Sequence, residues 1–197
     1  MESILNIIRE YDFAIYYALY QQGLDSSLIS WLNYIFAKYG IVLFILSFSY
    51  LIWKKRINAF LCSFSAMAIG GLIDLIIFVF WRRPRPFVTH GDVIVPPPML
   101  DELSADRMSS FPSSHTYIVF AIAVSVYLYG HKRLGSVLFI LAIFTALGRI
   151  GTGLHYPSDT IGGALLGILS GIIAYRIVHQ AEKNWRYDEG EIAGADR

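Results

Sequence analysis

Residues 111–130, FPSSHTYIVFAIAVSVYLYG, place a proline, two serines and a histidine directly before an apolar run. Pro112 is a favoured first-turn residue, so Pro112–His115 predicts a helix start whose free backbone N–H groups face outward. The apolar run has the length that a helix needs to cross a bilayer, roughly 20 residues. This stretch therefore predicts a membrane-spanning helix with polar groups at its amino-terminal end.

The rest of the chain has the composition of a membrane protein. Its 197 residues are 55% hydrophobic, more than is usual for a soluble domain. Five segments are long and apolar enough to span a bilayer: 31–53, 57–81, 112–130, 134–153 and 159–179. Residues 1–22 carry Arg9, Glu10 and Asp12 close together, so we expect an interfacial helix there, with a sixth span as the alternative. The predicted fold is an all-α bundle of five or six transmembrane helices.

The distribution of charge predicts which parts face the cytoplasm. Short loops rich in Lys and Arg stay on the cytoplasmic side, and three such regions fall on one side if the spans alternate: Lys54–Arg56, His131–Arg133, and the tail with Arg176, Lys183 and Arg186. We expect a transmembrane domain over 28–180, preceded by an N-terminal helix over 1–27 and followed by a cytoplasmic tail over 181–197. The long connection 82–111 is expected to be an extracytoplasmic loop. It contains four arginines that depart from the rule and so indicate a local function: Arg82, Arg83, Arg85 and Arg107.

Other features limit the possible partners. The net charge of +1 provides no field for nucleic acid, and the lone Cys62 cannot form an intrachain disulfide. Glu2 stands where a signal peptide carries basic residues, so we expect no cleaved leader. The oligomeric state is left open.

Three polar clusters are predicted at one membrane face. RRPRPF (82–87) ends the second span, FPSSH (111–115) begins the third, and GRIGTGLHYPSD (148–159) joins the fourth and fifth. Together they supply two guanidiniums, two hydroxyls, two imidazoles and a carboxylate, from Arg85 and Arg149, Ser113 and Ser114, His115 and His155, and Asp159. Arginine forks match phosphate oxygens, and a helix N-terminus attracts anions. The clusters therefore predict a phosphate site.

Two features of the third cluster concern its chemistry. Asp159 follows His155 by four residues, and a carboxylate bonded to one ring nitrogen leaves the other available as a base or nucleophile. Ser158 could cap the fifth span. The neighbouring arginines would repel a divalent cation, so we expect neither metal nor cofactor.

These motifs resemble those of the type-2 phosphatidic acid phosphatase superfamily, whose pattern is Lys-x6-Arg-Pro, then Pro-Ser-Gly-His, then Ser-Arg-x5-His-x3-Asp. The resemblance covers about residues 57–175. The third motif keeps its spacing from Arg149 through His155 to Asp159. The departures are Phe78 at the lysine position (Ile76 if counted from Arg83), Ser114 for the glycine and Gly148 for the first serine.

The resemblance implies a role for each matching residue. His155 would attack phosphorus, Asp159 would orient its ring, and His115 would serve as general acid and base. Phosphate would be bound by Arg85, Ser113, Ser114 and Arg149. Within the superfamily, RPRPFV, SFPSSHT and GLHYPSD are most similar to bacterial undecaprenyl-diphosphatases of the bacitracin-resistance type. This implies hydrolysis of a polyprenyl diphosphate lipid on the outer face of the cell membrane.

Other charged and small residues receive supporting interpretations. For Arg82 and Arg83 we favour interfacial snorkelling, with phosphate support as the alternative. Lys38 and Asp74 are predicted to pair at similar depth, unless Lys38 instead reaches phosphate in place of the missing lysine. A stripe of small residues in the fifth span predicts tight helix packing, within or between chains: Gly163, Gly167 and Gly171.

Two competing functions stay open. A phosphatase of the same fold could act on phosphatidylglycerol phosphate, phosphatidic acid or lipid A, because the reactive groups would be identical. A small lipid transporter would instead spread its ionisable residues through the spans, whereas here they gather at one face.

Overall fold

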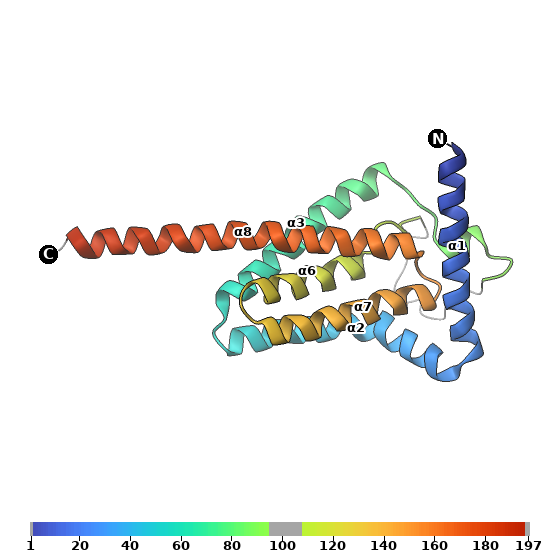
Figure 1. Cartoon of the computed structure of the whole chain (residues 1–197), viewed down its shortest axis with the longest axis horizontal. Coiled ribbons are helices and arrows are strands. Elements are labelled where there is room, and N and C mark those ends of the chain that lie inside the picture. Colours follow the sequence, from blue (N-terminus) through green and yellow to red (C-terminus); the bar gives the residue numbers. More distant parts are fainter. Residues whose placement is uncertain (1, 95–107, 196–197) are drawn as a thin grey trace.

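The computed structural model describes residues 2–94 and 108–195. Seven helices follow one another along this part of the chain: α1 (Glu2–Asp25), α2 (Ser27–Trp53), α3 (Ile57–Phe80), α4 (Pro86–Thr89), α6 (Ser114–Leu128), α7 (Lys132–Gly151) and α8 (Pro157–Ala195) (Figure 1). The β-type pairing within the described residues is a single isolated bridge between Arg83 and Ser109. The predicted all-α fold is confirmed.

Five helices form the bundle, and each overlaps one of the five predicted spans. α6 lies at its centre, where it packs against α3, α7 and α8. By length and composition, α2, α3, α7 and α8 can each cross a membrane, while α6 is a shorter apolar helix of 15 residues. Its buried side chains include Val119, Ile122 and Val126, which join the main apolar core. The protein is a multi-pass membrane protein.

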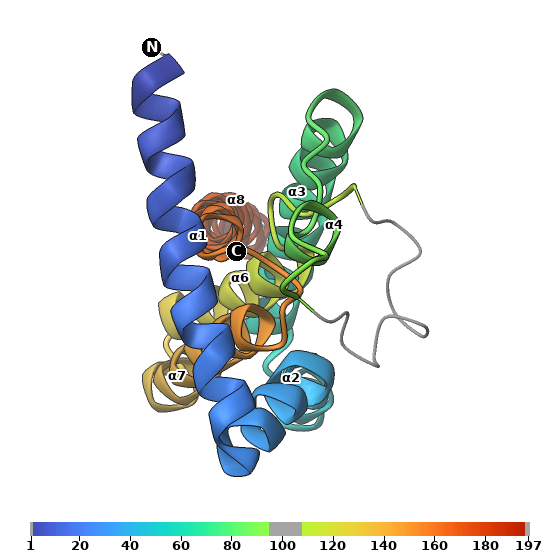
Figure 2. The same cartoon turned by 90° about the vertical axis from the view of Figure 1, so that its right-hand side faces the viewer.

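Helix α1 lies crosswise over one end of the bundle rather than beside the other helices (Figures 1 and 2). It contacts α2, α7 and α8, and it is not among the described helices that are long and apolar enough to span. This orientation is the one expected of an interfacial helix, and the location of residues 1–22 at the membrane surface stays a prediction.

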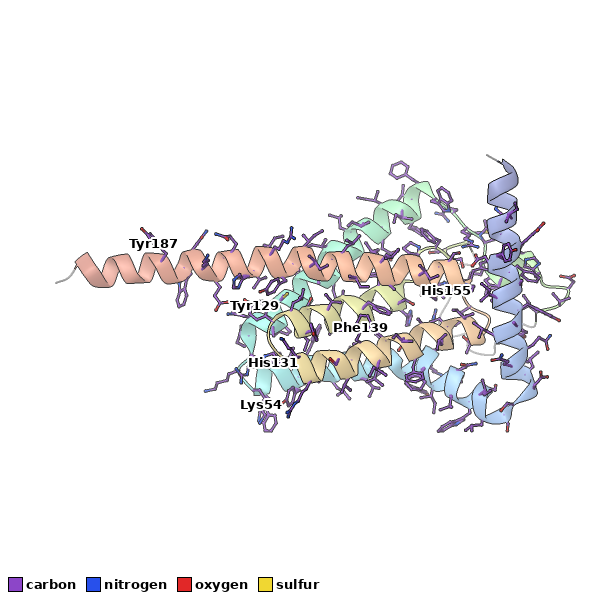
Figure 3. The ribbon with its side chains drawn as sticks, viewed as in Figure 1. Lys54, Tyr129, His131, Phe139, His155 and Tyr187 are labelled. Carbon is purple, nitrogen blue, oxygen red and sulfur yellow. The ribbon has the colours of Figure 1, made fainter. Side chains whose placement is uncertain are left out.

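Helix α8 is much longer than the predicted fifth span. It continues past residue 179 to Ala195 and extends beyond the bundle, where Tyr187 is labelled in Figure 3. Residues 180–189, QAEKNWRYDE, contain no glycine or proline and several strong helix formers. The segment predicted as a tail is therefore helical as far as the structure describes it.

The glycine stripe of α8 packs within the chain. A Cβ at Gly163 would lie 2.6 Å from the carbonyl oxygen of Ser113, and one at Gly167 would collide with the carbonyl oxygen of Tyr117. Since both oxygens belong to α6 or its N-cap, the small residues let α8 approach the backbone of α6. Of the two alternatives left by the sequence, the structure shows packing inside one chain.

The ion pair predicted between Lys38 and Asp74 is not formed. Asp74 accepts a hydrogen bond of 2.8 Å from the Ser114 hydroxyl, and the Lys38 ammonium donates to the Tyr34 hydroxyl at 3.1 Å. A partner one turn away on the same helix satisfies Lys38 with less ordering than a reach across to α3 would need. Asp74 therefore supports the start of α6 rather than pairing with α2.

The connection 82–111 is more ordered than a simple loop over its described parts. It contains α4, and the backbone N–H of Ser110 donates to the carbonyl of Arg83 at 3.0 Å. Arg107 and the prolines at 96–98 lie outside the described residues. The bridge brings the end of this connection back to its beginning.

Candidate active site

The three polar clusters meet at the end of the bundle that α1 covers. Figure 3 shows His155 at this end, while Lys54 and His131 lie at the opposite end. Arg85 precedes α4, Arg149 is in the last turn of α7, and Asp159 is in the first turn of α8. The predicted common face is thus formed by segments that are far apart in the sequence.

His155 lies at the centre of this group and is 2% exposed. Its Nε2 is 3.2 Å from Nη1 of Arg85 and 3.2 Å from Nη2 of Arg149. Its Nδ1 lies 2.8 Å from the carbonyl oxygen of Ser110. A carbonyl only accepts, so Nδ1 carries the proton and the lone pair is on Nε2, between the two arginines.

The surroundings keep the ring of His155 neutral. Burial lowers the pKa of this imidazole well below its usual value of 6.5, and the charges of Arg149 and Arg85 lower it further. The hydrogen bond to Ser110 acts in the opposite direction but is the weaker influence. At neutral pH Nε2 is unprotonated and keeps the lone pair that a nucleophile requires.

Asp159 acts on His155 through Ser110 rather than directly. Its Oδ2 is 3.7 Å from Nδ1 of His155, beyond hydrogen-bond distance. The same carboxylate accepts from the Ser110 hydroxyl at 2.5 Å, from the Tyr156 amide at 2.8 Å and from Arg83 at 2.6 Å. Asp159 therefore fixes both segments that hold the imidazole, which differs from the direct bond predicted.

Backbone carbonyls hold the side chains of Arg85 and Arg149 in place beside His155. Arg85 donates to the carbonyl of Leu154 at 3.0 Å, and Arg149 donates to that of Ala37 at 3.3 Å. Both guanidiniums are buried, and Nε of Arg149 has no partner among the described residues. Two buried cations against one nitrogen repel each other, and a phosphate dianion between them would compensate both.

The start of α6 lies beside Asp159. Ser113 is its N-cap, and the Ser113 N–H donates to the backbone carbonyl of Asp159 at 3.0 Å. The Ser113 side chain does not cap the first turn, so the N–H groups at Ser114 and His115 keep the orientation that suits an anion. Pro112 precedes the helix instead of opening its first turn, because Ser113 already has extended backbone angles.

The hydroxyl groups of the two predicted phosphate ligands have protein partners. The Ser113 hydroxyl accepts from Thr116 at 3.0 Å, and the Ser114 hydroxyl is the one that donates to Asp74. His115 is the second residue of α6. The start of α6 thus brings a second imidazole to the end of the bundle where His155 lies.

Arg83 is a structural centre of the site, so the snorkelling interpretation is wrong for this residue. Its Nη1 donates to Asp159 and to the Ser158 hydroxyl, each at 2.6 Å, and its Nη2 donates to Asp12 at 2.6 Å. The guanidinium also stacks on the ring of Tyr156, 4.2 Å from its centroid. Two carboxylates at 2.6 Å hold the half-buried cation within the site instead of letting it extend outward.

Arg82 differs from its neighbour. It is exposed and lies 4.6 Å over the ring of Phe78. This position fits the interfacial role favoured for it.

Two residues of the site were missed in the sequence. Ser110 contributes a backbone carbonyl, which any residue could supply, so its identity carries no signal. Asp12 accepts a hydrogen bond from the backbone N–H of Ser158 at 2.8 Å. The first turn of α8 is therefore capped by Asp12 of α1, and not by Ser158 as predicted. The one signal for Asp12 was its place beside Arg9 and Glu10, a group of charges in a largely apolar segment.

In the described part of the chain, no group of three or more His, Cys, Asp and Glu residues is arranged to hold a metal ion. The arrangement instead combines a neutral imidazole, two buried guanidiniums and an uncapped helix start. These groups are suited to binding and attacking a phosphoryl group.

A family comparison identifies the same region. Residues 59–183 match the model of the PAP2 superfamily. The chain belongs to the PAP2 superfamily. The matched segment runs from α3 into α8 and contains the three clusters.

The individual proteins that match this chain have different names. The chain is 32% identical over 123 residues to the undecaprenyl-diphosphatase BcrC of Bacillus subtilis, covering 62% of this chain and 58% of the relative. It is 34% identical over 110 residues to the bacitracin transport permease protein BcrC of Bacillus licheniformis, covering 56% and 51%. It is 37% identical over 71 residues to the lipid A 4'-phosphatase of Bacteroides thetaiotaomicron, covering 36% and 32%. The matches thus span little more than half of each relative at most.

Solved structures share the fold over more of their length. The crystal structure of Aquifex aeolicus LpxE superposes with a TM-score of 0.65 at 25% identity, covering 83% of this chain and 94% of that one. The PAP2-type phosphatidylglycerolphosphate phosphatase of Bacillus subtilis superposes with a TM-score of 0.61 at 18% identity, covering 91% and 88%. These matches confirm a PAP2 transmembrane fold.

Proposed function

We propose that this protein is a membrane lipid phosphatase that hydrolyses undecaprenyl diphosphate to undecaprenyl phosphate and inorganic phosphate. The observation that carries the proposal is the setting of His155, whose Nε2 faces Arg85 and Arg149 at 3.2 Å while Nδ1 is held by a carbonyl. The similarity to the BcrC undecaprenyl-diphosphatase supports the choice of lipid.

The first step of the proposed reaction transfers the terminal phosphoryl group to the protein. The Nε2 lone pair of His155 forms a bond to phosphorus while the bond from phosphorus to the bridging oxygen breaks. His115 gives its proton to that oxygen, and undecaprenyl phosphate leaves. Arg85, Arg149 and the N–H groups at the start of α6 stabilise the charge on the three equatorial oxygens.

The second step returns His155 to its neutral form. Water attacks phosphorus, the N–P bond breaks and the electron pair returns to Nε2. His115 accepts the proton from the water, so it begins the next cycle as an acid. In the two steps, His155 carries the phosphoryl group and His115 gives and takes up the proton. Neither step uses a metal ion.

We also propose that the reaction takes place on the extracytoplasmic side. The site lies at the end opposite Lys54 and His131 (Figure 3), and short basic connections stay in the cytoplasm. The apolar outer surfaces of the helices would keep the polyprenyl tail in the bilayer while the diphosphate enters from the interface.

Phosphate release by the purified full chain in detergent, with excess chelator, tests the proposal. We expect release from undecaprenyl diphosphate, and a loss of at least about 10³-fold in kcat for His155→Ala, the order seen when a nucleophile is removed. His131→Ala is the matched control at the other end of the bundle and should keep wild-type activity.

The same assay is repeated with other phosphorylated lipids. Faster release from phosphatidylglycerol phosphate, phosphatidic acid or lipid A would overturn the choice of substrate and keep the phosphatase. Loss of activity on chelation, or full activity of His155→Ala, would contradict the mechanism. No release from any of these lipids would favour the transporter.

A further inference from the structure

We propose that Asp12 of α1 is a positioning residue for His155, so that the crosswise helix α1 helps to set the rate of the reaction. This inference rests on the proposed function of His155 as the nucleophile. It adds a residue outside the segment that matches the superfamily, which begins at residue 59.

Asp12 is buried, with 7% of its surface exposed, and both of its oxygens are used. Oδ1 accepts from the backbone N–H of Ser158 at 2.8 Å. Oδ2 accepts from the Ser158 hydroxyl at 2.5 Å and from Nη2 of Arg83 at 2.6 Å. A carboxylate at this place satisfies a free donor of α8 and interacts favourably with the positive end of the helix dipole.

A set of hydrogen bonds leads from Asp12 through Ser110 to Nδ1 of His155, on the side of the ring away from the reacting Nε2. Arg83 holds Asp12 with Nη2 and Asp159 with Nη1, each at 2.6 Å. Asp159 accepts from the Ser110 hydroxyl at 2.5 Å, and the Ser110 carbonyl accepts from Nδ1 of His155 at 2.8 Å. All of these links are short, and most are charge-assisted, which makes them the stronger kind.

The charges along this path depend on one another. Arg83 is a single cation shared by two carboxylates, so each acid helps to fix the guanidinium for the other. Without the charge of Asp12, one arm of the Arg83 fork loses its ionic partner, and the guanidinium can move and take the bound Asp159 carboxylate with it. Such a shift would pull Asp159 away from the Ser110 hydroxyl and change the angle at which Nε2 meets phosphorus.

Aromatic side chains of α1 also contact the residue after His155 and the end of α4. Phe13 stacks on His90 with ring centroids 3.9 Å apart, and Tyr16 packs against Tyr156 at 5.5 Å. The Tyr16 hydroxyl would lie 3.2 Å from a Cβ at Gly153, a residue with φ of +81° that glycine adopts without strain. Helix α1 thus packs against the segment that contains His155.

Kinetics of Asp12→Asn in the purified full chain test the inference. Asparagine keeps the shape and an oxygen that can accept from Ser158, but it loses the charge that Arg83 uses. We expect kcat to fall about tenfold, the effect of losing one charge-assisted hydrogen bond, with KM within about twofold of wild type. Glu10→Gln, an exposed acid of the same helix, is the matched control and should change neither constant.

A double variant separates positioning from general loss of structure. Because Asp12 acts through Arg83, adding Asp12→Asn to Arg83→Gln should lower kcat no further than Arg83→Gln does alone. Multiplied effects, or a change confined to KM, would overturn the inference. So would a wild-type kcat for Asp12→Asn.

A measurement without substrate distinguishes failure of this inference from failure of the proposed function. Backbone hydrogen exchange of residues 109–115 should be faster in Asp12→Asn than in Glu10→Gln, because the Ser110 segment is held through the Arg83 path. If no lipid is hydrolysed but exchange increases, the function is wrong and the link stands. Unchanged exchange together with an unchanged kcat would overturn the link while leaving the phosphatase intact.

Discussion

The proton of His155 is placed by a backbone group, and this is the part of the site that sequence could not predict. The residue types were predictable: Arg149, His155 and Asp159 have a spacing that indicates phosphate chemistry. The acceptor for Nδ1 was not, since the Ser110 carbonyl lies 45 positions from His155 and could come from any residue. Asp12 was missed for a similar reason, because its partners lie 71 and 146 positions away.

The burial of a neutral His155 predicts a dependence of stability on pH. Since its pKa in the folded protein is well below 6.5, the unfolded chain takes up a proton below that pH while the folded chain does not. The free energy of unfolding should be unaffected by this group above pH 6.5, and should fall below it by up to about 1.4 kcal/mol per pH unit.

Comparison with His155→Gln isolates this effect. Thermal unfolding midpoints of the two proteins are measured in detergent from pH 7.5 to 5.0. The wild-type midpoint should fall more steeply than that of the variant below pH 6.5. Parallel curves would show that the imidazole takes up a proton in the folded state as readily as in the unfolded chain.

The contact between α6 and α8 joins the two halves of the site. Sequence predicted both helices and the small-residue stripe, because apolar length and glycine spacing are local properties. It could not predict which helix the stripe meets, nor that α8 continues to Ala195, because no break marks the end of the span. The contact matters for function because Ser113 at the head of α6 is bonded to Asp159 at the head of α8.

Alanine substitutions along the stripe should differ in a predictable order. A methyl group at Gly167 collides with the rigid carbonyl of Tyr117, whereas one at Gly171 first meets the Val124 side chain at 3.0 Å. Gly167→Ala should lose about 1–3 kcal/mol of stability, the usual cost of overpacking, and Gly171→Ala should lose less. Thermal unfolding in detergent measures both, and a Gly171→Ala loss equal to or larger than that of Gly167→Ala would contradict the packing.

The whole molecule has two chemically different ends. Basic connections lie at one end, and the buried imidazole with its two arginines lies at the other, beneath α1 (Figures 1 and 3). The apolar spans between them were evident from composition, and so was the gathering of polar motifs at one face. The position of α1 across that face could not be predicted from the sequence, because its contacts join residues that are distant in the sequence. In the proposed function, this arrangement would bring a lipid diphosphate from the bilayer surface to the buried His155.

Trapping the covalent intermediate tests the central claim, attack by His155 on phosphorus, most directly. The full chain is mixed with undecaprenyl diphosphate labelled with ³²P at the terminal phosphorus, quenched within one turnover, and digested for peptide mapping. The account predicts label on His155, stable in base and lost in acid, and no label on His155→Ala. Label on another residue, or labelled His155→Ala protein, would contradict it.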